Sequence, residues 1–297
     1  MLLKDLTISL DKFFNINSIS KDLPFSNILP SLYDKCNYPW KKYFTPLFLK
    51  NFHGLMFDNN ADVAMIAGTV FLDENVIDKI LLQKEKNILI FTHHPMADET
   101  SGRGFKPLSE EYLEKLKKRK ISVYSLHSPL DINTEISTTL SFLKACGLKK
   151  KERFVKEMGG SIGIIGEFDE PMEFESFINL LKKISKTKRI NFKQNINHIR
   201  KVGIVPGGAT DVSFIEDAIN QGCDTYLAGE YYNKLQIKVG EEERKVFAEK
   251  LSQLNINMIE VSHYISERFV FQDGLKELFE KKFKLKYKFF EQDNPWY

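Results

Sequence analysis

From residue 61 onward, short runs of β-branched and other apolar residues alternate with stretches in which apolar residues recur at helical spacing. The short runs predict buried strands, and the spaced pattern predicts amphipathic helices. The predicted strands span residues 63–71, 87–92, 122–126, 162–166, 202–205, 225–228 and 257–261. The predicted helices span residues 74–83, 109–118, 134–145, 171–186 and 211–221. This alternation is typical of an α/β protein with mixed sheets flanked by helices.

Two charge-rich segments, residues 149–157 and 186–200, interrupt the alternation. A chain of 297 residues is about twice as long as an average domain, so we expect two α/β lobes. We place the boundary near Lys150. The N-terminal lobe is then 1–150 and the C-terminal lobe is 151–297.

The ends of the chain have weaker patterns. The first 60 residues carry prolines among aromatic residues, which predicts an irregular segment with one or two short helices and indicates little about function. Lys and Phe alternate near residues 282–290, which predicts a half-buried terminal strand; a surface for an anionic partner is the alternative.

Composition excludes several classes of protein. The 43 Lys and Arg residues against 40 Asp and Glu residues leave a net charge of +3, which indicates neither a nucleic-acid nor a membrane surface. Three cysteines form no Cys-x-x-Cys pair, which is typical of a reducing compartment and argues against a thiolate zinc site. The N-terminus does not resemble a signal peptide, and the longest apolar stretch, residues 63–72, is too short to cross a bilayer. We expect a cytoplasmic protein.

Two adjacent histidines follow a predicted central strand. Residues 87–92 lead directly into His93-His94-Pro95, so both imidazoles stand at the carboxyl end of the strand, where open α/β sheets bind ligands. Pro95 is expected to end the strand and to release His94 from strict alternation, so that both rings face one crevice. Adjacent histidines are equally compatible with exposed or capping positions, so this site needs support from other strand ends.

Two further predicted strands end in the same way. His127 follows one of them, and a turn through the next proline can bring Asp131 back beside it. His263 follows another, and a helix that begins there would place His263 and Glu267 on one face. A single pair of this kind is more often structural. The same arrangement at three strand ends indicates a metal site.

The expected ligands combine imidazole nitrogens with carboxylate oxygens. They are His93, His94, His127, Asp131, His263 and Glu267. Such a set suits zinc, manganese or iron, and it exceeds the needs of one tetrahedral ion, so two divalent ions fit better. A single structural ion with the other histidines nearby stays open. Two ions about 3.5–4 Å apart would generate hydroxide near neutral pH and stabilise a hydrolytic transition state.

These motifs, in this order, resemble the Nif-three-like dinuclear metal-centre proteins, the DUF34 family. The resemblance rests on strand-His-His-Pro, Ser-Leu-His-x-x-Leu-Asp and a late His-Tyr-x-Ser-Glu. Two glycine-containing segments add to it: KVGIVPGGATD from Lys201, and CDTYLAGE, which ends at Glu230. The likeness extends from about His53 to Glu267.

The resemblance implies two related α/β lobes, a metal pair in the crevice between them, and homohexamers. Carried over by position, the six residues given above are the ligands, and Glu267 is the bridging carboxylate with a catalytic role. The sequence departs from the family around Ala67-Gly68-Thr69, at Glu135-Ile-Ser-Thr and at Tyr231-Tyr232-Asn233, where many members carry histidine. The substrate contacts are therefore less well defined than the metal ligands.

We expect a homo-oligomeric, dinuclear metal-dependent hydrolase that acts on a small, nucleotide-like or phosphorylated substrate. Many family members are called GTP cyclohydrolase type 2 homologs, and this activity is implied by resemblance alone. The alternative is a metal-binding interaction or regulatory protein without turnover, because a fully ligated centre leaves no exchangeable water. No nucleic-acid or membrane partner is expected.

Several other polar residues have two readings each. Pro206-Gly207-Gly208 could hold a phosphate through backbone amides, or could form only a tight turn. Glu230 could line the crevice or serve as the first acid of a helix. His53 and His198 are isolated in the sequence and are expected to be structural.

Overall fold

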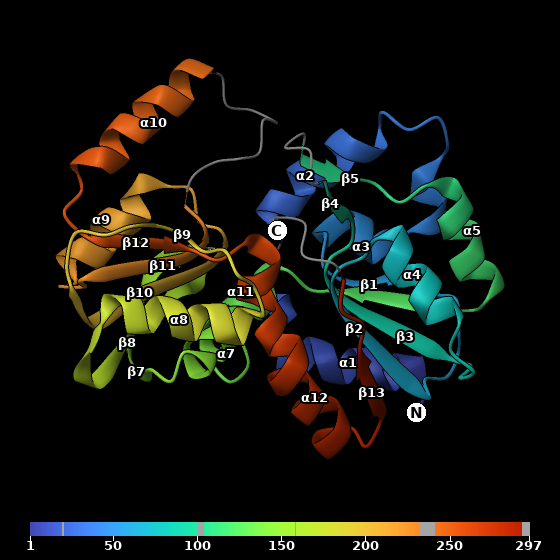
Figure 1. Cartoon of the computed structure of the whole chain (residues 1–297). Coiled ribbons are helices and arrows are strands. Elements are labelled where there is room, and N and C mark those ends of the chain that lie inside the picture. Colours follow the sequence, from blue (N-terminus) through green and yellow to red (C-terminus); the bar gives the residue numbers. More distant parts are fainter. Residues whose placement is uncertain (20, 100–103, 158, 232–240, 293–297) are drawn as a thin grey trace. The chain divides into compact units, whose positions relative to one another are not determined.

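The chain forms two compact units. The computed structural model describes residues 1–19, 21–99, 104–157, 159–231 and 241–292 (Figure 1). The first unit consists of Met1–Glu99, Phe105–Glu135 and Phe271–Asp293, and the second consists mainly of Ile136–Val270. Each unit contains a mixed sheet with flanking helices, so the predicted α/β fold class is confirmed.

A five-stranded mixed sheet forms the centre of the first unit. In spatial order its strands are β1 (Gly54–Phe57), β6 (Ser122–Ser125), β3 (Ile88–His94), β2 (Met65–Phe71) and β13 (Lys286–Phe289). The last four are mutually parallel, whereas β1 is antiparallel to β6. Every residue of β2 and β3 is buried, as expected for central strands covered on both faces.

The helices of the first unit cover this sheet. They are α1 (Leu3–Phe13), α2 (Leu23–Tyr33), α3 (Pro46–Asn51), α4 (Glu74–Leu81), α5 (Glu110–Lys118), α6 (Ser128–Asp131) and α12 (Leu275–Glu277). Shorter helical turns are η1 (Ile16–Ser18), η2 (Trp40–Tyr43) and the π-helical η4 (Leu278–Lys282). A second π-helix, η3 (Val270–Gly274), begins at the last residue of the segment Ile136–Val270 and continues into the first unit. A two-stranded sheet pairs β4 (Ala97–Glu99) with β5 (Gly104–Lys106).

The first 60 residues are more regular than predicted. Pro24 and Pro46 lie in the first turns of α2 and α3, where proline is compatible with a helix because those N–H groups have no intrahelical partner. Aromatic side chains from this segment, including Phe25 and Trp40, are buried in one cluster with residues of the first sheet. The aromatic residues that obscured the sequence pattern therefore belong to the core.

A six-stranded mixed sheet forms the centre of the second unit. In spatial order its strands are β7 (Lys149–Glu157), β8 (Gly160–Glu173), β10 (His198–Gly208), β11 (Thr225–Glu230), β12 (Asn257–Glu260) and β9 (Asn191–Lys193). The three strands β10, β11 and β12 are parallel, and the remaining pairings are antiparallel. The helices are α7 (Thr138–Ala145), α8 (Phe174–Ser185), α9 (Val212–Asn220), α10 (Glu241–Gln253) and α11 (His263–Phe269).

The observed division of the chain differs from the predicted boundary near Lys150. The charge-rich segment 149–157 is strand β7, whose exposed lysines lie at the edge of the second sheet. Residues 271–293 return to the first unit because β13 pairs in parallel with β2. Helix α8 begins at Phe174, so Pro171 lies in β8 and not in the helix as predicted. These differences depend on pairing between distant segments, which local pattern does not encode.

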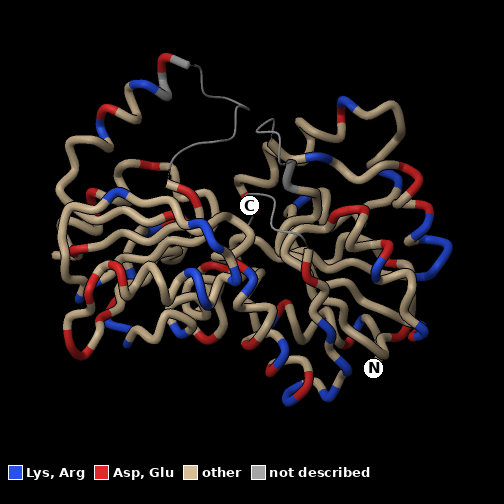
Figure 2. The backbone as a smooth tube through the Cα atoms, in the orientation of Figure 1, with Lys and Arg blue, Asp and Glu red and all other residues tan. Residues whose placement is uncertain are grey.

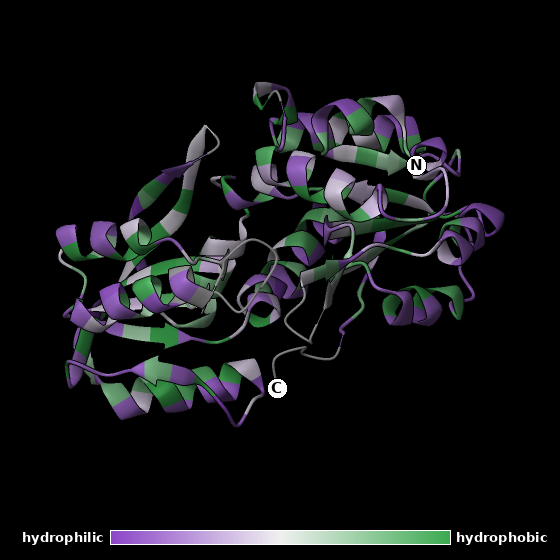
Figure 3. Ribbon diagram, turned by 90° about the horizontal axis from the view of Figure 1, so that it is seen from above, coloured by the Kyte–Doolittle hydropathy of each residue, from purple (hydrophilic) through white to green (hydrophobic). Residues whose placement is uncertain are grey.

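Apolar residues are concentrated in the strands, whereas the helices show both apolar and polar positions (Figure 3). The second unit has its own apolar cluster, which includes Ile165, Ile215 and Tyr226. Residues of both charge signs are interspersed along the two units (Figure 2). Among the described residues, no helix has the length and apolar character needed to cross a membrane.

Candidate metal centre

Three histidines meet at the carboxyl edge of the first sheet. His93 and His94 end β3, and His127 follows the parallel neighbour β6. The amide of Leu126 donates to the carbonyl of Thr92 at 2.9 Å and so extends the pairing of these strands to the histidines. The carboxyl ends of neighbouring parallel strands meet at one sheet edge, which explains why residues more than 30 positions apart converge.

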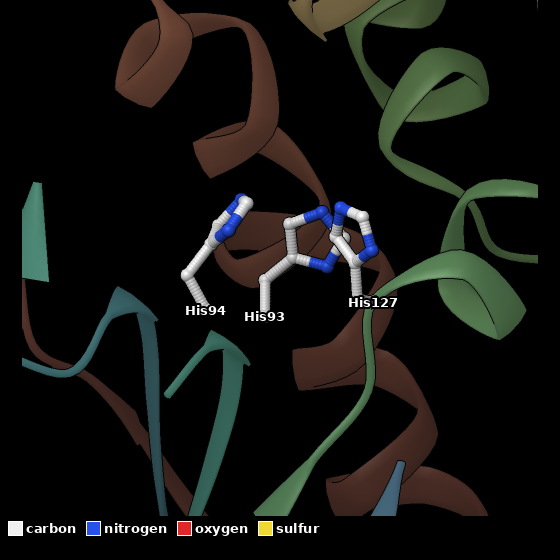
Figure 4. A group of neighbouring side chains, drawn as sticks. All are labelled: His93, His94 and His127. Carbon is white, nitrogen blue, oxygen red and sulfur yellow. The ribbon is translucent and has the colours of Figure 1, made fainter. Parts of the chain in front are cut away.

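The three imidazoles form a compact group (Figure 4). Their ring centroids lie 4.4 Å apart for His93 and His94, 5.0 Å for His93 and His127, and 5.2 Å for His94 and His127. One ring nitrogen from each residue lies within 4.8 Å of the other two, which is close enough for all three to bind one metal ion. The predicted convergence of these three residues is thus present in the structure.

The route to this convergence differs in one respect from the prediction. Pro95 was expected to release His94 from the strand, but His94 pairs with Phe71 of β2 and its carbonyl accepts from the amide of Leu72 at 2.9 Å. The imidazole of His94 stacks on the ring of Phe71, with centroids 4.3 Å apart and planes inclined by 14°. The ring is therefore fixed by a neighbouring strand and not by a free turn.

Hydrogen bonding fixes the tautomer of His93. Its Nδ1 lies 2.8 Å from the carbonyl oxygen of Leu126. A carbonyl oxygen only accepts, so Nδ1 carries the proton and donates. In the neutral ring the electron pair is then on Nε2, which is the nitrogen that would bind a metal ion. Asp131, at the end of the short helix α6, places Oδ1 3.5 Å from this Nε2.

A buried carboxylate fixes His127 in the same way. Nδ1 of His127 lies 3.2 Å from Oδ2 of Asp22, which is fully buried. Burial alone would raise the pKa of Asp22, but the charge of His127 and hydrogen bonds from His127, Ser128 and the Phe25 amide outweigh it and hold the pKa well below its usual range. The carboxylate therefore accepts from Nδ1–H of His127, and when this imidazole is neutral its electron pair is on Nε2.

In the second unit, His263 and Glu267 lie one turn apart on α11. Nε2 of His263 is 3.1 Å from Oε1 of Glu267, as the predicted helix and its i,i+4 spacing require. Oε2 of Glu230, the last residue of β11, is 3.9 Å from Nδ1 of the same imidazole. All three side chains are buried. The structure therefore adds Glu230 to the surroundings of His263.

Glycines allow this pair to pack against neighbouring backbone. Gly207 has φ of +70°, and a Cβ there would lie 2.5 Å from Oε1 of Glu267 and 3.3 Å from Nε2 of His263. A Cβ on Gly229 would lie 2.5 Å from both the Gly207 carbonyl and Oγ of Ser266. A side chain at Gly207 would displace the Glu267 carboxylate, and one at Gly229 would collide with the backbone of Gly207, so glycine at these positions leaves room for the carboxylate and for the neighbouring strand end.

The backbone before α11 is also constrained. Ser262 has φ of 144°, which is strained for a residue with a side chain, and its Oγ accepts from the amide of Ile265 at 3.1 Å. The amide of Gly207 donates to Oγ of Ser266, which in turn donates to the carbonyl of His263 at 2.8 Å. The amide of Gly207 is used in this way, which argues against phosphate binding there. Pro206-Gly207-Gly208 form the irregular end of β10, where the register against β11 shifts, and not the separate tight turn that was the alternative.

The remaining histidines belong to neither group. His53 is buried, with Nε2 3.1 Å from the carbonyl of Ile19, and His198 lies on the surface beside Glu173. Tyr232 and Asn233, at which the sequence departs from the family pattern, lie outside the described residues. Sequence reasoning missed Asp22: the run Asp-Leu-Pro signals a helix N-cap, but it does not indicate a contact with a histidine 105 positions away.

Comparison with known proteins agrees with this architecture. A protein from Haemophilus influenzae named GTP cyclohydrolase 1 type 2 homolog is 25% identical over 247 residues, which cover 82% of this chain and 90% of that protein. A Pyrococcus horikoshii protein of the same name is 27% identical over 252 residues, or 83% of this chain and 90% of its own.

Solved structures share the fold. The protein ybgI, described as of unknown function, superposes with a TM-score of 0.70 at 17% identity, over 99% of this chain and 100% of its own. Reduced HcgD from Methanocaldococcus jannaschii has a TM-score of 0.62 at 18% identity and 98% coverage of both chains. The sequence model of the Duf34/NIF3 (NGG1p interacting factor 3) family matches residues 50–295. This chain therefore belongs to the Duf34/NIF3 family.

Proposed function

We propose that this chain is a metal-dependent hydrolase that binds two divalent ions, zinc, manganese or iron. The observation that carries the proposal is the group of three imidazoles at the carboxyl edge of the first sheet, with ligand nitrogens within 4.8 Å of one another. His93 and His94 are buried and His127 is partly buried. Imidazoles packed this closely would repel one another if all were protonated, and in their neutral form they are suited to sharing a cation.

The donor chemistry fits such ions. Hydrogen bonds to Leu126 and Asp22 hold the Nδ1 protons of His93 and His127, so Nε2 of each neutral ring is available as the electron-pair donor. Imidazole and carboxylate ligands without thiolate suit zinc, manganese and non-haem iron. The residue types and the ring tautomers thus both support metal binding.

The proposed ligands come from both units. They are His93, His94, His127, Asp131, His263 and Glu267. We propose that they are the ligands of the two divalent ions and that Glu267 is the catalytic carboxylate. When bound, two divalent ions lower the pKa of a water molecule and stabilise the negative charge of a hydrolytic transition state. The chain's own contribution is to hold the imidazoles in fixed tautomers and, through Glu230 beside His263, to orient the ring of the second unit.

The proposed substrate is small and nucleotide-like or phosphorylated. The name shared by the curated relatives, GTP cyclohydrolase 1 type 2 homolog, makes GTP the first compound to test. Purified full-length protein should be analysed for metal content, loaded with Zn²⁺ or Mn²⁺, and assayed with GTP, other nucleotides, phosphodiesters and small amides. We expect two metal ions per chain and metal-dependent turnover of at least one of these classes of compound.

His94→Ala should abolish this turnover, and His198→Ala is the matched control because His198 is an exposed histidine outside both groups. A protein that binds neither Zn²⁺ nor Mn²⁺, or whose turnover is indifferent to metal, would contradict the proposal. Two bound ions without any turnover would favour the metal-binding interaction protein instead. The homo-oligomeric state, including a hexamer, stays a prediction that light scattering can test.

A further inference from the structure

Asp22 is a buried acid in the segment that precedes the family match, which begins at residue 50. It is the N-cap of α2, and its Oδ1 accepts from the amide of Phe25 at 3.0 Å. An N-cap aspartate usually lies at the surface, because a carboxylate is costly to bury unless its oxygens are satisfied. A fully buried cap therefore indicates a second set of partners.

Those partners lie beside the histidine group. Oδ2 of Asp22 accepts from the amide of Ser128 at 3.0 Å and from its Oγ at 2.6 Å, and Nδ1 of His127 lies 3.2 Å away. Phe25, in the first turn of the same helix, stacks on the imidazole of His127 with centroids 4.1 Å apart and planes inclined by 15°. One helix start thus holds the edge of the imidazole through Asp22 and its face through Phe25.

We infer that Asp22 is a positioning residue for His127 as a metal ligand. This inference rests on the proposed function. The carboxylate keeps the proton on Nδ1, leaves Nε2 as the ligand atom, and fixes the direction in which Nε2 points. The N-terminal segment outside the family match then takes part in the metal site without supplying a ligand.

The simpler alternative is that Asp22 only caps α2 and receives the amide of Ser128. Asp22→Asn separates the two roles. Asparagine caps helices about as well as aspartate, so the variant should keep α2. Its neutral amide is a weaker acceptor for the imidazole N–H than a carboxylate, and the ring therefore loses its preference for one tautomer.

Two matched variants control for other effects of the substitution. Asp73→Asn changes an N-cap aspartate of α4, which accepts from the amide of Val76, in the same unit. Asp11→Asn changes a half-buried acid that accepts from the hydroxyl of Tyr124 at 2.7 Å. Neither acid belongs to the proposed metal site.

The experiment uses the full-length protein. Long-range ¹H–¹⁵N spectra of the metal-free form report the His127 tautomer, and competition with a chelator gives the dissociation constant for Zn²⁺. We expect the wild type to show the Nδ1–H form. Asp22→Asn should show mixed tautomers and a dissociation constant raised by about 10–100-fold, the usual loss when the partner of a ligating histidine is removed. Both control variants should keep the wild-type spectrum and affinity.

The outcomes separate this inference from the proposed function. If Asp22→Asn keeps the wild-type tautomer and Zn²⁺ affinity, the positioning role is wrong while the metal site stands. An equal loss in Asp11→Asn or Asp73→Asn would also overturn it, because the effect would then be general destabilisation. If the wild type binds no Zn²⁺ at all, the proposed function fails and this inference fails with it.

Discussion

The two candidate ligand groups lie at equivalent places in their sheets, yet they are built differently. In the first unit, His93 and His127 come from different strands and are oriented by a backbone carbonyl and by a buried carboxylate. In the second unit, His263 and Glu267 are one helical turn apart, and glycine backbone packs against them. The first group depends on strand register, and the second depends on a helix and on space beside it.

This difference indicates where each group is vulnerable. A shift of β3 against β6 would separate the first group, whereas α11 keeps its pair together by local geometry alone. In the second unit, a side chain added at Gly207 or Gly229 is expected to displace the groups around His263 and Glu267. The following predictions test this contrast, from the largest expected effect to the smallest.

Removal of a ligand from the first group should have the largest effect. In His93→Ala the metal loses a proposed ligand. Removing only the hydrogen-bond partner of a ligand lowers metal affinity by up to about 100-fold, so removing the ligand itself should lower the affinity for Zn²⁺ by more than that. Metal analysis and chelator competition measure this. His198→Ala should be indistinguishable from wild type, and unchanged affinity in His93→Ala would remove the first group from the proposed site.

The two glutamates of the second unit should differ in importance. Glu267 lies 3.1 Å from Nε2 of His263, while Glu230 lies 3.9 Å from Nδ1. We expect Glu267→Gln to lower the number of bound ions from two towards one. Glu230→Gln should keep both ions and weaken binding by about tenfold, as for other partners of ligating histidines. If Glu230→Gln loses an ion and Glu267→Gln keeps both, Glu230 is the ligand and Glu267 only orients His263.

Gly207→Ala should damage the second group through crowding. A positive φ costs alanine about 1–2 kcal/mol, and displacing the Glu267 carboxylate adds about 1–3 kcal/mol of overpacking. Gly222→Ala is the matched control, because Gly222 has φ of +76° but no atom within 4 Å of a new Cβ. In denaturant unfolding, the free energy of unfolding should fall more in Gly207→Ala than in Gly222→Ala. The affinity for Zn²⁺ should fall only in Gly207→Ala. Equal losses would mean that Gly207 matters only for its backbone angle.

The smallest effect is expected from the ring that stacks on His127. An aromatic pair contributes about 0.5–1.5 kcal/mol beyond burial, so Phe25→Leu should weaken Zn²⁺ binding by less than about tenfold. Phe48→Leu is the control: Phe48 is fully buried in the same cluster, and its ring packs against Phe44 and Phe52. If the two variants have similar free energies of unfolding and only Phe25→Leu binds Zn²⁺ more weakly, the stacked ring orients the imidazole.

Local pattern was sufficient for much of the fold. The buried runs of β2 and β3 and the amphipathic α4 and α9 follow from spacing of apolar residues along a short stretch. The His263–Glu267 pair was also predictable, because i,i+4 contacts depend only on the helix that carries them. The convergence of His93 and His127 required one further assumption, that their strands are parallel neighbours.

The sequence by itself therefore determined the α/β class, the main strands and the residue types that gather at their carboxyl ends. Only the tertiary structure decided that β13 returns to the first sheet, that Asp22 reaches His127, and that Gly207 leaves room for Glu267. The physical reason is the distance along the chain over which each interaction acts. Hydrophobic periodicity and helix geometry act between near neighbours in the chain, whereas sheet register and the burial of a carboxylate depend on segments that meet only after folding.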